Sequence, residues 1–310
     1  MSLPNFTVFT PTFNRAHTLA RVYDCLVSQT FKNFEWLIVD DGSTDETRAL
    51  VMTWELNSPF EVRYIYQDNA GRHVADNRGA SEARGAFYAV IESDDWYVPT
   101  ALETFMRAWE SIDASERDGF AGIVGLCADP AGYVIGSPFP RDPLDTTYTE
   151  MRRKFGVTGD KAGVARTDVI RQFPYPVIPG EKFWIDALVY NRIARQFRVR
   201  CVNDVIQVRD YQADGMGAWE RETSAFVRNP RTSTLFFTEL AHDELMTGVG
   251  RVRAYANLTR YASHGGRALF AHSLREAPSK AWWVLTLPLA CVLFLRDHLR
   301  QFRRRAAARE

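Results

Sequence analysis

Residues 36–43 of this 310-residue chain read WLIVDDGS, an apolar run that ends in two aspartates, a glycine and a serine. An apolar run bounded by turn residues is typical of a strand buried on both faces of a parallel sheet. Ser43 and Glu46 have the spacing of a capping box, which predicts that a helix follows the turn. The stretch therefore predicts a strand–turn–helix unit with two carboxylates at the end of its strand.

The same alternation of strand and helix patterns extends outward on both sides. Apolar runs predict strands over 6–10, 62–66 and 87–91, and apolar residues at helical spacing predict helices over 19–27 and 74–84. Repeated β-α-β units of this length form a mostly parallel, right-handed sheet. We expect an α/β fold with a Rossmann-like sheet and helices on both faces.

The pattern changes after about residue 120, and from about residue 219 onward it is helical. We therefore expect one domain over 1–215, with halves 1–120 and 121–215, and a helical C-terminal extension over 216–310. Between 120 and 219 the sequence predicts a hairpin (123–128 with 133–136), a helix (184–196) and strands over 199–202 and 205–211.

The composition is that of an ordinary soluble protein, with 46% hydrophobic and 25% charged residues. Lys and Arg together number 38, as do Asp and Glu, so the net charge is zero and no nucleic-acid partner is expected. The four cysteines form no C-x-x-C pair, which favours a reducing compartment. The chain opens without a basic region and apolar core, so we expect no signal peptide and a cytoplasmic protein.

Acidic clusters follow two of the predicted strands, Asp40-Asp41 after one and Glu92, Asp94 and Asp95 after the other. The carboxyl ends of parallel strands meet at the crevice where ligands bind. Carboxylates crowded there repel one another unless a cation lies between them, and Mg2+ or Mn2+ prefers oxygen ligands. Either cluster alone is equally explained as a turn, but two together predict a metal and phosphate site.

Several other site types are excluded by their missing motifs. The sequence contains no G-x-G-x-x-G after its first strand, no G-x-x-x-x-G-K-[ST] and no G-x-S-x-G. A Rossmann dinucleotide site, a P-loop and a serine-nucleophile elbow are therefore poorly supported.

The first hundred residues also carry short motifs in a fixed order. They are TPTFNR at 10–15, SQTF at 28–31, FE at 34–35, VDDGSTD at 39–45, Asn77, Gly79, ARG at 83–85, and ESDD at 92–95 followed by Pro99. In this order and spacing, residues 5–99 resemble the inverting glycosyltransferases of family two, which have the nucleotide-diphospho-sugar transferase (GT-A) fold. The resemblance implies transfer of a sugar from a UDP- or GDP-linked donor to a saccharide or lipid-linked acceptor, in surface polysaccharide or glycolipid synthesis of the cell envelope.

The resemblance also assigns residues to the donor site, which lies in the donor half, 1–120, with 121–215 as the acceptor half. Asp94 is implied to bind the Mn2+ or Mg2+ that bridges the diphosphate, with Glu92 and Asp95 as further metal candidates. The residues implied to bind the nucleotide are Thr10, Pro11, Asn14, Arg15, Asp40, Asp41, Asn77 and Ser93.

Two positions depart from the family pattern. Glu92 stands where the D-x-D motif has Asp, which leaves its direct role on the metal open. Asp76 stands where the family often has an Arg that faces the nucleotide. Arg72 is a candidate for the missing cation through a bidentate phosphate contact, and a solvated helix start is an equal explanation for Arg72 and His73.

Inversion requires a carboxylate that takes the proton of the acceptor hydroxyl. The family usually places this base as the last residue of Glu-Asp, six positions before an Arg. Asp186 precedes Arg192 by that spacing, with Ile185 in place of the Glu. Asp186 as a plain helix N-terminal residue is the alternative, and Glu181 is the second candidate for the base.

The stretch 281–295 has Thr286 as its single polar side chain, and five arginines follow it between 296 and 305. Fifteen residues fall short of the roughly 20 that span a bilayer. An apolar segment with a basic flank predicts contact of 281–305 with a membrane surface, which would make the protein peripheral on the inner face of the cytoplasmic membrane. A C-terminal helix packed on the core explains the same pattern.

Two alternative functions are less well supported by the sequence. Nucleotidyl transfer to a sugar phosphate requires a Gly-rich basic loop after the first strand, and residues 11–15 are not such a loop. A non-catalytic relative that binds sugar nucleotide or tethers partners at a membrane is favoured only by Glu92 and Asp76.

Overall fold

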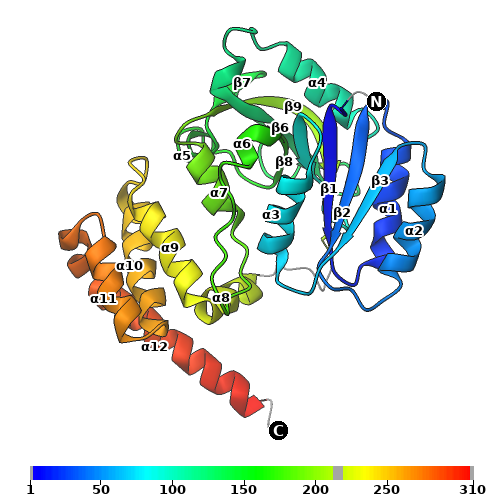
Figure 1. The fold of residues 1–310 in the computed structure, drawn as a ribbon. Helices are drawn as coiled ribbons and strands as arrows, with labels where there is room; N and C mark the ends of the chain where they lie inside the picture. Colours follow the sequence, from blue (N-terminus) through cyan, green and yellow to red (C-terminus); the bar gives the residue numbers. More distant parts are fainter. Residues whose placement is uncertain (1–2, 212–218, 308–310) are drawn as a thin grey trace. The chain divides into compact units, whose positions relative to one another are not determined.

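The computed structural model describes residues 3–211 and 219–307. The chain divides into an α/β unit, Met1–Tyr175 with Val189–Asp214, and a helical unit, Pro176–Leu188 with Gly215–Glu310 (Figure 1). The segment 176–188, which the sequence analysis assigned to the first domain, thus groups with the C-terminal helices. Each unit is described in turn.

Four parallel strands form one half of the sheet in the α/β unit. They are β1 (Phe6–Thr12), β2 (Phe34–Asp40), β3 (Glu61–Tyr66) and β4 (Phe87–Val90), in the order β3-β2-β1-β4. The α/β fold predicted from the sequence is confirmed. Because β2 and β3 lie on one side of β1 and β4 on the other, the strand order reverses between β1 and β4, and a ligand crevice is expected at their carboxyl ends.

Alternate residues of these strands face opposite layers of helices. Val8 and Trp36 pack with α1 (Ala16–Val27), α2 (Thr47–Asn57) and α4 (Ala101–Glu110). Phe9 and Leu37 pack with α3 (Arg72–Glu82) on the other face. The strands are buried on both sides, and this is why they read as continuous apolar runs.

The other half of the sheet is mixed. The sheet continues from β4 through β8 (Lys161–Arg166), β6 (Phe120–Ala128) and β9 (Arg198–Val208) to β5 (Trp96–Tyr97), and β7 (Leu144–Thr146) pairs with β9. β8 is antiparallel to both of its neighbours, whereas β6 and β9 are parallel. The short helices here are η1 (Arg117–Gly119), α5 (Tyr148–Arg153), α6 (Thr167–Ile170) and α7 (Asp186–Ile193).

Two local predictions for this half need correction. The predicted hairpin is present only in short form, as an antiparallel bridge between Ala128 and Val134 with a hydrogen bond from the N–H of Ile135 to the carbonyl of Cys127 (2.8 Å), because β6 takes its strand partners from β8 and β9. The two strands predicted over 199–211 are one strand, β9, which shifts register against β6 between Val124 and Leu126.

The capping box predicted for α2 is also absent. The Oγ of Ser43 accepts a hydrogen bond from the backbone N–H of Asn14 (2.8 Å). Asp45 instead accepts from the N–H (3.1 Å) and hydroxyl (2.6 Å) of Thr47, the first residue of α2. Ser43 therefore ties the loop after β2 to the loop after β1, at the edge where the crevice is expected.

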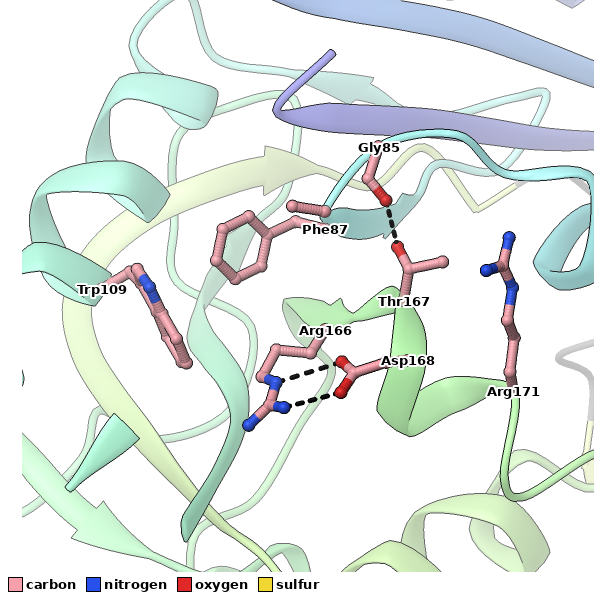
Figure 2. A pocket seen from close by; sticks show the side chains of 8 residues that line it. Gly85, Phe87, Trp109, Arg166, Thr167, Asp168 and Arg171 are labelled. Carbon is pink, nitrogen blue, oxygen red and sulfur yellow. Dashed lines mark hydrogen bonds and ion pairs between the residues drawn. The ribbon is translucent and has the colours of Figure 1, made fainter. Parts of the chain in front are cut away.

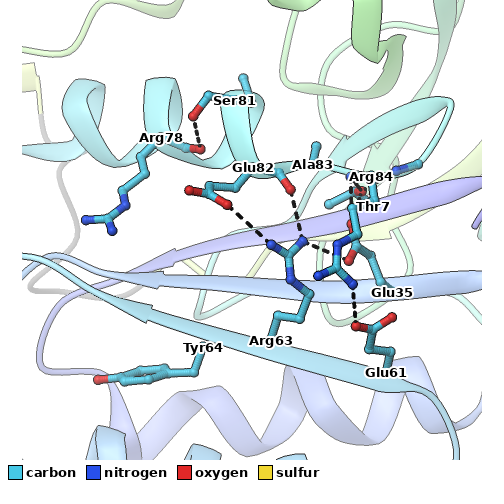
Figure 3. Close-up of polar contacts among 12 residues, drawn as sticks. Thr7, Glu35, Glu61, Arg63, Tyr64, Arg78, Ser81, Glu82, Ala83 and Arg84 are labelled. Carbon is cyan, nitrogen blue, oxygen red and sulfur yellow. Dashed lines mark hydrogen bonds and ion pairs between the residues drawn. The ribbon is translucent and has the colours of Figure 1, made fainter. Parts of the chain in front are cut away.

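A fully buried carboxylate, Glu35, joins the strands to the turn before β4 (Figure 3). Its Oε1 accepts from the hydroxyl of Thr7 (2.6 Å) and the backbone N–H of Arg84 (2.8 Å), and its Oε2 accepts from Arg63 (2.9 Å). Removing one partner of such a buried pair typically costs about 3–5 kcal/mol. The FE and ARG motifs therefore have a structural role in the sheet.

The helical unit contains α8 (Trp219–Arg228), α9 (Pro230–Ala241), α10 (Gly248–His264), α11 (Arg267–Glu276) and α12 (Lys280–Ala307). No strand follows β9 in the described part of this region, as predicted. α12 continues through Pro288 for 28 residues, nearly twice the length of the apolar stretch recognised in the sequence. Its residues Lys280–Arg303 are long and apolar enough to cross a membrane by length and composition, so the length argument against a span is wrong.

Candidate active site

The loop after β4 carries Glu92, Ser93, Asp94 and Asp95, as the sequence predicted, and it lies next to the start of α3. The guanidinium of Arg72, the first residue of α3, donates through both terminal nitrogens to the two carboxylate oxygens of Glu92, with Nη2 to Oε1 at 2.9 Å. Burial alone would raise the pKa of Glu92, but the charge and hydrogen bonds of Arg72 hold that pKa below its usual value. Glu92 and Arg72 are thus an ion pair.

The pKa of Asp94, in contrast to that of Glu92, is raised by its surroundings. Burial and the negative charge of Glu92 raise the pKa of Asp94, and the positive charges of Arg15 and Arg209 compensate only in part. A divalent cation beside this half-buried carboxylate would reverse the balance. Asp94 is therefore a carboxylate of this loop whose surroundings favour an added cation.

Asp95 is attached to the end of β9. Its two carboxylate oxygens accept from Gln207 Nε2 (2.7 Å) and from the backbone N–H of Asp210 (3.2 Å), and Arg209 lies 3.7 Å away. Burial raises the pKa of Asp95 to about 7, and Arg209 opposes the rise. Sequence reasoning missed Gln207 and Arg209, because they lie more than 110 residues from Asp95 and belong to no local motif.

The two aspartates after β2 are buried and hold loops of the protein. Asp41 accepts from Gln67 Nε2 (2.8 Å) and from the backbone N–H groups of Ala70 (2.9 Å) and Gly71 (2.8 Å). Asp40 accepts from the N–H of Ser43 (2.8 Å) and the hydroxyl of Tyr64 (2.6 Å). These contacts fix the loop that leads into α3 and Arg72.

The remaining predicted nucleotide residues lie in three kinds of place. Thr10 and Pro11 are buried in β1, where the hydroxyl of Thr10 accepts from Trp36 Nε1 (3.0 Å), and Ser93 is buried in the β4 loop. Asn14 and Arg15 are half-buried in the loop after β1. Asn77 is attached elsewhere: its amide donates to the carbonyl of Tyr175 (2.9 Å) and accepts from the N–H of Tyr175 (2.8 Å).

The two candidates for the base belong to the segment 176–188 of the helical unit. Asp186 is the first residue of α7, where the helix dipole favours the ionised carboxylate. Glu181 accepts from the backbone N–H groups of Arg231 (2.8 Å) and Thr232 (2.7 Å) and from the Thr232 hydroxyl (2.6 Å). Glu181 thus caps the N-terminus of α9.

The donor set fits Mg2+ or Mn2+ completed by substrate. In the described residues, no group of three or more His, Cys, Asp or Glu side chains is arranged to hold a metal ion. These cations commonly bind through one or two carboxylates, with water and substrate phosphate in the other positions. Asp94 meets that requirement.

A hollow lies at the amino-terminal end of β4, around Phe87, Trp109 and Arg166 (Figure 2). Arg166 is paired with Asp168 (2.6 Å), and Arg171 donates to the carbonyls of Ala80 (2.9 Å) and Ala83. The charged groups that line this hollow are thus engaged by other groups of the protein.

Comparison with solved structures supports the fold. S. aureus TarS 1–349 in complex with UDP-GlcNAc has a TM-score of 0.58 at 17% identity, over 92% of this chain and 80% of that one. The mannosyltransferase PcManGT of Pyrobaculum calidifontis, solved with GDP-Man and Mn2+, has a TM-score of 0.54 at 20% identity, over 96% and 88%. The sheet, its switch point and these likenesses define a GT-A fold with a helical C-terminal extension.

The sequence comparisons then give the family. The profile of Glycosyl transferase family 2 matches residues 7–166, just over half of the chain, and the chain belongs to this family. It is 35% identical over 105 residues to the uncharacterized glycosyltransferase YibD of Escherichia coli, covering 34% of this chain and 30% of YibD. It is 28% identical over 127 residues to the GalNAc(5)-diNAcBac-PP-undecaprenol beta-1,3-glucosyltransferase of Campylobacter jejuni, covering 40% of this chain and 38% of that enzyme. These matches span 30% of the length of YibD and 38% of the length of the Campylobacter enzyme.

Proposed function

We propose that this protein is an enzyme that transfers a glycosyl unit from a nucleoside diphosphate sugar, UDP- or GDP-linked, to an acceptor hydroxyl with inversion. The observation that carries the proposal is the placement of Asp94: a half-buried carboxylate at the β1/β4 switch point, within the electrostatic reach of Arg15 and Glu92. Family membership and the GT-A fold support the same reaction.

Each residue of the crevice takes a role in this proposal. Asp94 holds Mn2+ or Mg2+, which when bound supplies positive charge for the departing diphosphate. Arg15 adds fixed positive charge beside it, and Arg72, whose charge is balanced by Asp76 and Glu92, holds the loop of Asp94 to α3. Asp40 and Asp41 shape the base and ribose pocket by holding its loops. The residues that line the pocket with them are Thr10, Pro11, Asn14 and Ser93.

Asp186 is proposed as the base. It removes the proton of the acceptor hydroxyl while that oxygen attacks C1 of the sugar from the side opposite the nucleotide, so the C1–O bond to the diphosphate breaks and the configuration inverts. Glu181 is proposed to be structural, because its carboxylate caps α9. We propose a saccharide or lipid-linked acceptor in surface polysaccharide or glycolipid synthesis, supported by the Campylobacter relative, whose name specifies an undecaprenol-linked acceptor.

The proposed reaction is tested with a panel of UDP- and GDP-linked sugars. We expect calorimetry with Mn2+ to identify one nucleotide that binds, and we expect its sugar conjugate to release that nucleotide slowly in water and faster with acceptor. Chelation by EDTA should suppress both signals. Tight binding without any release, with a full acceptor panel, would instead support the non-catalytic relative.

We further propose that α12 lies in the plane of a membrane surface. One face of the helix packs within the helical unit: Trp283 contacts Phe270 and Ser273 of α11, Asp297 pairs with Arg260 of α10 (2.7 Å), and Ala290 is buried. A helix held along one side in this way presents only its other face to lipid, as in-plane anchors do. That face is apolar, and its exposed residues are Val284, Leu285, Leu289, Val292, Leu295, Leu299 and Phe302. Exposed Arg296, Arg300 and Arg303 provide charge for anionic lipid.

Replacing Leu285, Leu289 and Val292 together by Ser should weaken binding to phosphatidylglycerol vesicles by at least about tenfold, because each exposed apolar side chain contributes on the order of 1 kcal/mol of transfer free energy. Cosedimentation measures the loss, and Leu56→Ser, which changes an 84% exposed leucine of α2, is the matched control. High salt should release only part of the protein. Retention after alkaline carbonate would indicate a spanning helix, and a dimer without vesicle binding would indicate that the face binds a second copy.

A further inference from the structure

Arg72 is held by two carboxylates from different elements. Its Nε donates to both carboxylate oxygens of Asp76 (3.0 and 3.1 Å), one turn further along α3. Its two terminal nitrogens donate to the two oxygens of Glu92, after β4. These three side chains, which we name the Arg72 clasp, join α3 to the loop that carries Asp94.

The Arg72 clasp lies largely out of solvent. The exposed fractions of the side chains are 17% for Arg72, 7% for Asp76 and 23% for Glu92. Charges buried to this extent are retained only with charged or hydrogen-bonding partners. Asp76 and Glu92 are the two positions where the sequence departs from the family pattern, and each supplies one carboxylate to the same guanidinium. One set of contacts therefore accounts for both departures.

The length of Glu92 matters for this geometry. Both of its oxygens meet terminal nitrogens of Arg72, which is the two-pronged pairing that aligns a carboxylate with a guanidinium. An aspartate at position 92 is one methylene shorter and would withdraw its oxygens from Arg72. Glu92 thus uses both of its carboxylate oxygens in the pairing with Arg72.

We propose that Glu92 is a positioning residue for Arg72 and not a ligand of the metal. Asp94 is then the one carboxylate of the described β4 loop that binds the cation, and the Arg72 clasp holds this loop against α3 with Arg72 beside the donor diphosphate. The inference rests on the proposed function, because it concerns a site for a nucleoside diphosphate and a divalent cation.

The decisive variant is Glu92→Asp, which restores the common D-x-D motif but removes the reach to Arg72. If Glu92 were a ligand of the metal, this variant would bind Mn2+ and nucleotide as well as the wild type or better. The clasp predicts that nucleotide affinity falls about tenfold, the scale seen when a residue that orients a site is lost. Calorimetry with UDP and GDP at saturating Mn2+, and with Mn2+ at saturating nucleotide, measures both affinities.

A double-mutant cycle separates positioning from coordination. Arg72→Met, Glu92→Leu and the double variant should all lower nucleotide affinity by the same factor, because each removes the same ion pair. Arg78→Met is the matched control on α3, since the contact described for Arg78 is a hydrogen bond to the backbone carbonyl of Tyr66 (3.4 Å). The nucleotide affinity of this variant should equal that of the wild type. Thermal unfolding without nucleotide checks that each variant folds. If a single variant does not fold, the nucleotide affinity of the double variant, in which both charged side chains are replaced by apolar ones, is compared with that of the wild type.

The possible outcomes distinguish the two proposals. Wild-type affinities in Glu92→Asp, or effects of Arg72→Met and Glu92→Leu that multiply in the double variant, would overturn the Arg72 clasp and leave the proposed function standing. A wild-type protein that binds neither UDP nor GDP with Mn2+ would overturn both. Equal losses in the two single variants and the double variant, with unchanged Arg78→Met, are the expected result.

Discussion

Asp94→Ala should abolish glycosyl transfer, with a loss of at least about 100-fold, and should remove the effect of Mn2+ on nucleotide binding. The reason is that Asp94 is a half-buried carboxylate at the switch point, whereas both oxygens of Glu92 and both oxygens of Asp95 accept hydrogen bonds from Arg72 and from the end of β9. Without Asp94, the diphosphate loses the cation. That cation would stabilise the negative charge that develops in the transition state by several kcal/mol. Calorimetry with and without Mn2+ measures the binding effect, and nucleotide release from the donor measures turnover.

Asp68→Ala is the matched control for this prediction. Asp68 is an exposed aspartate in the loop after β3, so the variant makes the same change in charge and side-chain size. It should bind nucleotide and turn over as the wild type does. If Asp94→Ala kept a response to Mn2+ as large as that of Asp68→Ala, the metal assignment would be refuted.

The parallel half of the sheet was predictable from sequence because its signals are local. A strand covered by helices on both faces must be apolar along its length, and Trp36-Leu37-Ile38-Val39 is fully buried as expected. The polar residues after each strand were also visible, since a parallel sheet brings these loops to one edge. Position along the chain was therefore sufficient to predict the crevice.

The mixed half was not predictable in the same way. Asp129-Pro130-Ala131-Gly132 forms the turn that its residues predict, but β6 pairs with β8 and β9, which lie far away along the chain. No local pattern specifies such partners, because long-range pairing is decided by packing. The same reason explains why Ser43, predicted to cap α2, instead contacts Asn14 in the preceding loop.

The site shows the same contrast between residue identity and residue contacts. The sequence marked Glu92, Asp76 and Arg72 as unusual, but it gave no sign that they meet, because Arg72 and Glu92 lie 20 residues apart on different elements. It also assigned Asp40, Asp41 and Asn77 to the nucleotide, and it gave no sign that each of them also hydrogen-bonds other residues of the protein. A motif identifies which residues matter, and the fold decides what each of them contacts.

Asp186→Asn should leave donor binding intact and lower turnover by roughly 100-fold or more, the scale for the loss of a positioned general base. The two side chains have nearly the same shape, so the fold should be retained. Steady-state turnover with acceptor, together with calorimetric donor binding, provides the two readouts. A loss of both would indicate that Asp186 serves the structure of α7 and not the proton transfer.

Glu181→Gln is the comparison that decides between the two candidates for the base. Glu181 accepts three hydrogen bonds at the N-terminus of α9, so the neutral variant should lose about 1 kcal/mol of stability while turnover stays close to that of the wild type. The reverse pattern, an inactive Glu181→Gln beside an active Asp186→Asn, would assign the base to Glu181. It would also require Glu181 to leave the end of α9 during the reaction, since both of its oxygens accept hydrogen bonds there.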